Sequence, residues 1–230
     1  MKKLFLMIAA LIVAASGALA QDFTVSARVG MNVAKIGGDV EDLEAKIGLK
    51  LGIAGCFPLV DNFYLETGAF YSPKGAKKSS SSEIDVLGVK TKYNEEYTMK
   101  LNYLEIPINA VYKYEINNNM SVRGHVGPYF GFGLFGKEKL EINGSVDGKM
   151  LNADGEEEES GDKSKAFSSK TGDCNYKRFD AGINFGGGME FGPCYLGIQY
   201  GVGLSNFNSK NSKDYKMRNN VFSVDFGFNF

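Results

Sequence analysis

The last nine residues of the chain, 222–230, alternate strictly between apolar and polar side chains. Every second position is apolar: Phe222, Val224, Phe226, Phe228 and Phe230. The positions between them hold serine, aspartate, glycine and asparagine. Because successive side chains of a strand point to opposite faces, one face of this segment is wholly apolar. In water such an edge strand invites aggregation, whereas the outer wall of a transmembrane barrel requires it. The segment therefore favours a membrane barrel over a soluble sheet.

The opposite end of the chain is organised like a secretory signal peptide. Lys2 and Lys3 precede an apolar run over residues 4–15, and residues 18–20 read Ala-Leu-Ala, a small-residue cleavage site. The run is too short to cross a bilayer as a helix. We expect a cleaved signal peptide over residues 1–20 and a single mature domain over residues 21–230, a length that suits one barrel or sandwich.

The period of two recurs along the mature chain. It predicts strands at about 23–36, 46–59, 63–73, 97–115, 121–136, 177–191, 195–207 and 221–230. Three of the connections are short, and four are long and polar: 37–45, 74–96, 137–176 and 208–217. This pattern predicts an all-β fold, an eight-stranded antiparallel transmembrane up-and-down β-barrel, with both termini and the short turns in the periplasm and the long loops outside.

Pro107 interrupts the predicted strand 97–115. Proline cannot donate a hydrogen bond to a ladder and is normally confined to edges and bulges. We therefore expect Pro107 to lie at a β-bulge near the middle of that strand, with its ring pointing inward.

Four short motifs, in order, resemble those of the PorT-like, or "porin family", outer-membrane β-barrel domain. They are Gly30-Met31-Asn32-Val33, Tyr103-Leu104-Glu105-Ile106-Pro107-Ile108, Gly127-Pro128-Tyr129-Phe130-Gly131 and Asp180-Ala181-Gly182. The second resembles the family's Y-L-E-I-P signature, so the resemblance makes Pro107 a family trait. The C-terminal strand is similar to the assembly signal of bacterial outer-membrane barrels, in which Phe222, Phe226, Phe228 and Phe230 would be the aromatic residues.

The resemblance spans essentially the whole mature chain and implies a place in the bacterial outer membrane. It implies contact with outer-membrane lipid and lipopolysaccharide, and with the barrel assembly machinery during biogenesis. PorT-like members are also associated with protein export, which suggests a periplasmic or membrane partner. The resemblance implies little about any activity.

The inward parity of the predicted strands carries most of the charge. These positions are Arg28, Lys50, Glu66, Glu105, Lys113, Arg123, His125, Asp180, Glu190 and Asp225. An eight-stranded barrel is barely wide enough for its own side chains, and buried charges are costly unless they are paired. We expect a polar network that fills the lumen. The alternative is a small passive porin-like channel, with a narrow cation path through a slightly acidic lumen.

Catalysis, cofactors and metals have little support in the sequence. A barrel enzyme would need His125, the single histidine, to pair with Asp180 or Glu105 and a serine, and nothing in the spacing indicates a nucleophile and its base. One histidine and three cysteines are too few for a crowded metal site. The net charge of −1 gives no argument for nucleic acid. We expect no enzyme, no cofactor, no metal and no nucleic-acid partner.

The three cysteines leave two interpretations open. Export makes a disulfide chemically feasible. The predicted topology places Cys56 and Cys194 near the periplasmic rim and Cys174 in an outer loop, so Cys56–Cys194 is the one plausible pair. Three unpaired cysteines are at least as good an interpretation. A disulfide requires the two Cα atoms to lie within about 7 Å, and the sequence alone does not give this distance.

A role as a structural or interaction protein is the leading hypothesis. A protein partner would bind at the predicted loops 74–96 and 137–176, or at the periplasmic rim, since binding residues concentrate on loops held by a rigid scaffold. The first loop contains a lysine- and serine-rich stretch at 77–82, and the second an acidic stretch at 154–162. A secreted soluble barrel with an apolar ligand would need an apolar lumen and a polar exterior, the reverse of this pattern.

Overall fold

The computed structural model describes residues 23–38, 43–86, 89–146, 149–151, 167, 176–208 and 216–230, with side chains throughout except at 82–94 and 140–151. The predicted signal peptide, the acidic stretch at 154–162 and Cys174 lie outside the described residues. No helix in the described part of the chain is long and apolar enough to cross a membrane.

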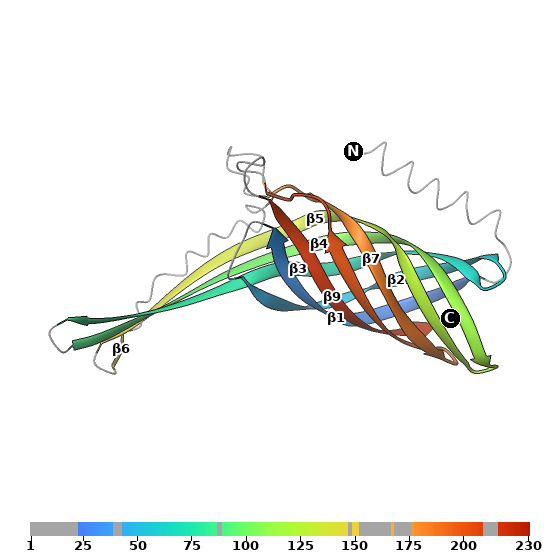
Figure 1. Cartoon of the computed structure of the whole chain (residues 1–230), viewed down its shortest axis with the longest axis horizontal. Coiled ribbons are helices and arrows are strands. Elements are labelled where there is room, and N and C mark those ends of the chain that lie inside the picture. Colours follow the sequence, from blue (N-terminus) through green and yellow to red (C-terminus); the bar gives the residue numbers. More distant parts are fainter. Residues whose placement is uncertain are drawn as a thin grey trace.

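Eight antiparallel strands close into a barrel (Figure 1), which confirms the predicted fold class. Each strand pairs with the next around the ring, β4 pairs with β5, and β9 pairs with β1 to close the wall. A ninth, three-residue strand, β6, extends the sheet at the far end of β5. The strands are β1 (Thr24–Gly38), β2 (Glu44–Val60), β3 (Phe63–Val86), β4 (Val89–Asn117), β5 (Met120–Val146), β6 (Lys149–Leu151), β7 (Phe179–Phe191), β8 (Cys194–Gly203) and β9 (Met217–Asn229).

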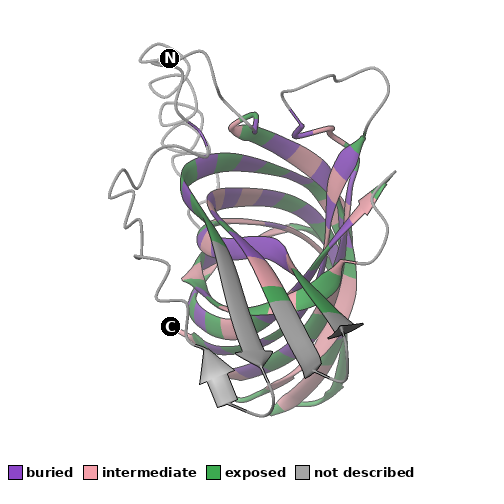
Figure 2. Ribbon diagram, turned by 90° about the vertical axis from the view of Figure 1, so that its left-hand side faces the viewer, coloured by how far each residue is buried: buried purple, intermediate pink, exposed green. Residues whose placement is uncertain are grey.

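The alternation seen in the sequence becomes an apolar outer wall and a polar interior. Along β9, Phe226 is 51% exposed on the outside, whereas the neighbouring Asp225 is 5% exposed inside. Figure 2 shows the same banding of buried and exposed residues around the wall. Large apolar side chains on an outer wall are stable when lipid surrounds them.

The short connections lie at one end of the barrel together with the last residue of the chain. Residues 61–62, 118–119 and 192–193 form tight turns, and Gly192 takes a positive φ of 53° that suits glycine. The Asn229 N–H donates to the Pro193 carbonyl (2.7 Å), and the Phe230 N–H donates to the Val25 carbonyl (2.8 Å). Outer-membrane barrels keep their short turns in the periplasm, so we assign this end to the periplasm.

Three strands continue far beyond the opposite end. β3 and β4 pair as far as Val86↔Val89, and β4 and β5 as far as Thr91↔Val146. The last pair between β2 and β3 is Glu44↔Lys77. Residues 78–86, 89–97 and 140–146, which we call the β-ribbon, therefore project from the barrel (Figure 1). The prediction of loops at 74–96 and at the start of 137–176 is wrong, because these residues form strands. The sequence did not reveal them, since strands with water on both faces lack the apolar alternation that marks a strand.

Pro107 is buried and faces the lumen, as predicted, but the predicted bulge is absent from this place. The register between β4 and β5 is the same at Tyr103↔Gly133 and Ala110↔Val126, on either side of Pro107. The Thr67 hydroxyl donates to the Pro107 carbonyl at 2.8 Å. A side-chain hydrogen bond thus supports the strand at the point where proline weakens the ladder.

Of the two interpretations left open for the cysteines, the structure agrees with the unpaired one for Cys56 and Cys194. Both cysteines are free. Cys56 is buried on the inward face of β2, whereas Cys194 shares the parity of the outward Leu196 on β8. Two strands, β1 and β9, lie between β2 and β8 in the sheet. The side chains therefore face opposite sides of the wall and cannot bridge.

Candidate functional site in the barrel lumen

The periplasmic half of the lumen holds an ion-pair network centred on Glu66. Its carboxylate accepts hydrogen bonds from Arg28 Nη1 (3.1 Å) and Nη2 (2.5 Å), and from Arg123 Nη2. Glu190 accepts from Arg123 Nη1 (3.2 Å) and from Lys113 Nζ (3.1 Å). Three cations and two carboxylates from five strands are thereby joined into one group.

The Tyr195 ring lies beside both arginines of this network. The guanidinium carbon of Arg28 is 4.4 Å from the ring centroid, and that of Arg123 is 5.2 Å away. Cation–π attraction of this kind is stronger where water is excluded. Tyr195 therefore offsets part of the surplus positive charge in the network.

A second cluster joins the inner faces of four neighbouring strands, β3, β2, β1 and β9. Lys50 Nζ donates to Asp225 Oδ2 at 2.9 Å. Asn32 donates to the Ser72 hydroxyl (3.0 Å) and accepts from the Ser223 hydroxyl (2.8 Å). These bonds tie the neighbouring strands β1, β2, β3 and β9 together on the inner face of the wall.

The third cluster surrounds Lys74, which is 1% exposed. Its ammonium group lies 2.8 Å from Glu105 Oε2 and 3.0 Å from Asp180 Oδ2. Asp180 also accepts from the Asn219 amide (3.0 Å) and the Ser205 hydroxyl (2.8 Å). A fully buried lysine is stable here because two carboxylates meet its charge.

Sequence reasoning missed Lys74, because the predicted strand ended at Pro73. The signal that could have found it is parity, since Lys74 continues the inward series of Phe70 and Ser72. With Lys74, the three clusters hold five basic and five acidic side chains. The slightly acidic lumen expected from the sequence is therefore balanced in charge.

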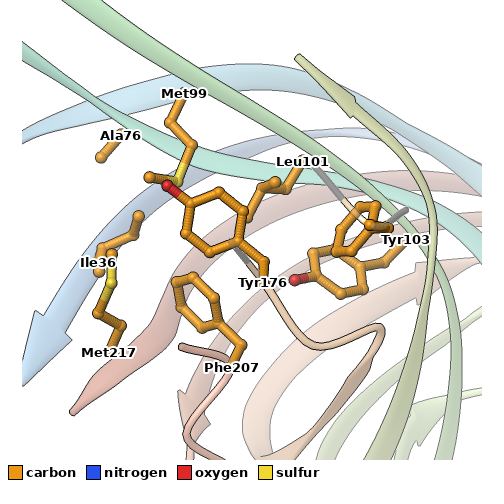
Figure 3. Close-up of a cluster of buried hydrophobic side chains, with 9 residues drawn as sticks. Ile36, Ala76, Met99, Leu101, Tyr103, Tyr176, Phe207 and Met217 are labelled. Carbon is orange, nitrogen blue, oxygen red and sulfur yellow. The ribbon is translucent and has the colours of Figure 1, made fainter. Parts of the chain in front are cut away.

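Apolar side chains close the extracellular mouth above Lys74. The cluster draws on strands and on the connecting segments (Figure 3): Ile36, Ala76, Met99, Leu101, Tyr103, Phe167, Tyr176, Phe207 and Met217. The rings of Tyr103 and Phe167 meet edge to face at 5.7 Å, and those of Tyr176 and Phe207 are tilted at the same distance. We call this group the apolar cap. The sequence does not reveal the apolar cap, because its residues lie far apart in the chain and come together only in the folded structure.

Tyr176 anchors the cap to β5. Its hydroxyl donates to the Glu138 carboxylate and lies 3.5 Å from the Tyr97 hydroxyl. Burial, together with the hydrogen bond to Glu138, raises the pKa of Tyr176, so the phenol stays protonated and keeps donating.

The lumen side chains are packed closely. A cavity of about 10 Å³ lies among Ser72, Lys74, Glu105, Asn184 and Gln199. This volume holds about one water molecule. The space around Lys74 is therefore filled by side chains rather than by a water column.

His125 does not form the arrangement that catalysis would need. Its Nε2 lies 3.2 Å from Gln199 Oε1, and no hydrogen bond joins it to Asp180 or Glu105 within the described residues. Asp180 is occupied by Lys74, Asn219 and Ser205. In the part of the chain that the structure covers, no group of three or more histidine, cysteine, aspartate or glutamate side chains could hold a metal ion.

All ten of the charged and histidine positions predicted for the lumen lie inside the wall, and the structure joins nine of them in ion pairs, with His125 held by Gln199. The four phenylalanines of the predicted assembly signal lie on the opposite face. Phe222, Phe226 and Phe228 line the outer wall, and Phe230 is exposed at the periplasmic end.

A closed barrel with an apolar exterior and a charge-paired interior is the architecture of an integral outer-membrane β-barrel protein. The family assignment agrees with this class. Residues 19–209 match the model of the outer membrane protein beta-barrel domain, and the chain belongs to this family. The protein is therefore located in the bacterial outer membrane, as predicted.

The solved structures that resemble the chain are small outer-membrane proteins. The crystal structure of Ail, the attachment invasion locus protein of Yersinia pestis, aligns over 91% of this chain and 100% of that one, with 13% identity and a TM-score of 0.35. Neisserial surface protein A aligns over 90% and 97%, with 12% identity and a TM-score of 0.41. OprG from Pseudomonas aeruginosa aligns over 90% and 95%, with 11% identity and a TM-score of 0.43. No curated protein sequence matches the chain significantly.

Proposed function

We propose that this protein is a non-conducting, non-enzymatic outer-membrane barrel that holds the β-ribbon outside the cell as a binding surface for a protein partner. The observation that carries the proposal is the contrast between the closed lumen and the projecting β-ribbon. The lumen is filled by paired charges and covered by the apolar cap. The β-ribbon instead extends paired backbone well beyond the barrel.

The β-ribbon has the properties of a strand-addition surface. Within the described residues, β3 no longer pairs with β2 beyond Lys77, and β5 no longer pairs with β7 beyond Phe132, although β6 pairs with β5 at residues 144–146. Unpaired strand edges can accept an extended segment of another chain through backbone hydrogen bonds. The resemblance to PorT-like proteins suggests a component of protein export as the partner.

Site-specific photocrosslinking in cells tests the proposal. A photoreactive residue at Ser80 on the β-ribbon should give a discrete protein adduct, whereas the same residue at Asn119 in a periplasmic turn should not. Replacing residues 79–96 by a two-residue turn should abolish capture and leave the heat-modifiable gel shift of the folded barrel unchanged. Adducts at Asn119 alone would refute the ribbon as the binding surface and move the site to the periplasmic rim.

The alternative function, a small passive channel, requires an open lumen. The balanced charges and the apolar cap favour the closed barrel over this alternative, since eight-stranded barrels are filled by their own side chains. The conductance measurement at the end of the Discussion separates the two.

A further inference from the structure

A group of lysines lies on the outer wall at the extracellular boundary of the membrane. Lys100 on β4 and Lys137 on β5 are directly paired in the sheet and both are exposed. Lys100 lies outside the barrel, because its neighbours Met99 and Leu101 point into the apolar cap. Lys137 lies directly opposite Lys100 in the sheet and therefore shares this outer face. Like charges directly opposite each other in a sheet are destabilising, so this pair is a site where bound negative charge is favourable.

Lys46 on β2 joins this pair from the side. A side-chain carbon built on Gly75 of β3 would lie 3.4 Å from Lys46 Cδ, so the stem of Lys46 lies against this glycine. Gly75 in turn pairs with Lys100. The absence of a side chain at Gly75 thus lets Lys46 reach toward Lys100. Burial, together with the charges of Lys100 and Lys77, lowers the pKa of Lys46. Lys46 pairs with the buried Ala34 of β1 and has the parity of the lumen-facing Lys50, so it flanks the exposed lysine pair and does not lie on the apolar outer face.

The nearby carboxylates are engaged elsewhere. Glu96 pairs with Lys77 at 3.2 Å, and Glu44 accepts a long hydrogen bond from Ser79 at 3.5 Å. Within the described part of the chain, no acidic side chain pairs with Lys46, Lys100 or Lys137. We call these three residues the lysine cluster.

The position of the lysine cluster along the barrel wall places it at the level of the lipid headgroups. One step below it, Tyr71 packs on Phe135 at 6.4 Å and its hydroxyl donates to Asn102 at 2.6 Å. Aromatic side chains with polar tips mark the level at which the hydrocarbon ends. Asn102 and Lys100 are two residues apart on β4, about 7 Å along a strand, so the ammonium groups lie at headgroup height.

We propose that the lysine cluster binds the phosphate groups of a phosphorylated lipid in the outer leaflet. Two exposed ammonium groups, Lys100 and Lys137, lie directly opposite each other on β4 and β5 at headgroup level, with Lys46 nearby across β3 and no acidic partner for any of the three within the described residues. This positive charge complements an anionic headgroup whose acyl chains lie against the apolar wall below. The site is distinct from the lumen and from the β-ribbon. The inference depends on the outer-membrane location and not on the proposed partner of the β-ribbon.

The test compares two matched double variants of the folded protein in detergent. K100Q/K137Q removes the central charges of the cluster, and K78Q/K177Q removes two exposed lysines elsewhere at the extracellular end. The probe is bisphosphorylated lipid A added at graded concentrations, and native mass spectrometry measures bound lipid. Each lysine near an anionic lipid surface contributes about 1 kcal/mol, so K100Q/K137Q should bind about thirty-fold more weakly, while K78Q/K177Q should bind like the parent.

Two further binding measurements test whether the phosphate groups and the lysine charges are responsible. Lipid A stripped of its phosphates should bind the parent as weakly as bisphosphorylated lipid A binds K100Q/K137Q, and K100R/K137R should restore binding because it restores the charge. Equal binding by the two glutamine variants would overturn the proposal. So would equal binding of the phosphorylated and dephosphorylated lipids, which would show that acyl-chain contacts alone hold the lipid. A heat-modifiable gel shift verifies that each variant is folded.

Discussion

At the scale of single residues, Glu66 is a buried carboxylate held by two cations in the lumen. It is 2% exposed and accepts hydrogen bonds from both Arg28 and Arg123. Removing one partner of a buried ion pair leaves uncompensated charge in a medium that solvates it poorly. Here, loss of the carboxylate would leave two guanidinium groups close to each other with no negative charge between them.

The substitution E66Q should therefore lower the free energy of unfolding by about 3–5 kcal/mol. The measurement is urea unfolding in lipid vesicles, followed by the mobility of folded and unfolded forms on a gel. E96Q is the matched control, because Glu96 and its partner Lys77 are 42% and 43% exposed, and an exposed pair is worth about 0–1 kcal/mol. An E66Q midpoint equal to that of E96Q would contradict the network described here.

The identities of the lumen residues could be predicted from the sequence, but their partners could not. Parity alone places Arg28 and Glu66 inside the barrel. Their contact joins residues 38 positions apart and depends on the register of β1, β2 and β3, which the alternation does not encode. Lys74 was missed for a related reason, since the strand boundary was set at the end of the apolar pattern.

At the scale of elements, close packing between strands constrains the inward glycines. A side-chain carbon on Gly182 of β7 would lie 2.1 Å from the Val202 carbonyl and 2.6 Å from the Tyr129 ring. On Gly124 of β5 the nearest atom would be 4.0 Å away. We expect G182A to destabilise the barrel by about 1–3 kcal/mol through overpacking, and G124A to stay within about 0.5 kcal/mol of the parent. Urea titration in vesicles checks both, and tolerance of G182A equal to that of G124A would argue against the packing of β7 on Tyr129.

The eight barrel strands could be predicted because lipid on one side imposes a period of two on each of them. β9 shows this most clearly, and its inward and outward residues lie as expected. The β-ribbon could not be predicted, because lysines and serines at 77–82 lie in a segment surrounded by water, where neither face must be apolar. Hydrophobic periodicity marks strands only where it also marks burial or lipid.

At the scale of the whole molecule, the barrel is closed at two levels. The ion-pair clusters fill the lumen, and the apolar cap covers its extracellular end. The first level follows from the narrow bore of an eight-stranded barrel. The apolar cap could not be predicted from the sequence, since it combines residues such as Ile36, Phe167 and Phe207 from distant segments. A closed lumen and an extended β-ribbon together support the proposed role as a membrane-anchored binding surface over that of a pore.

Single-channel recording in a planar bilayer tests the closed lumen most directly. The mature protein is refolded, its folded state is verified by a heat-modifiable gel shift, and a wide porin serves as the positive control for insertion and recording. We expect a silent bilayer, because the cavity beside Lys74 has room for about one water molecule and the charged side chains around it are paired. Steady, reproducible openings from folded protein would contradict the closed barrel, and would make Glu66, Glu105, Asp180 and Asp225 the lumen residues to test for ion selectivity.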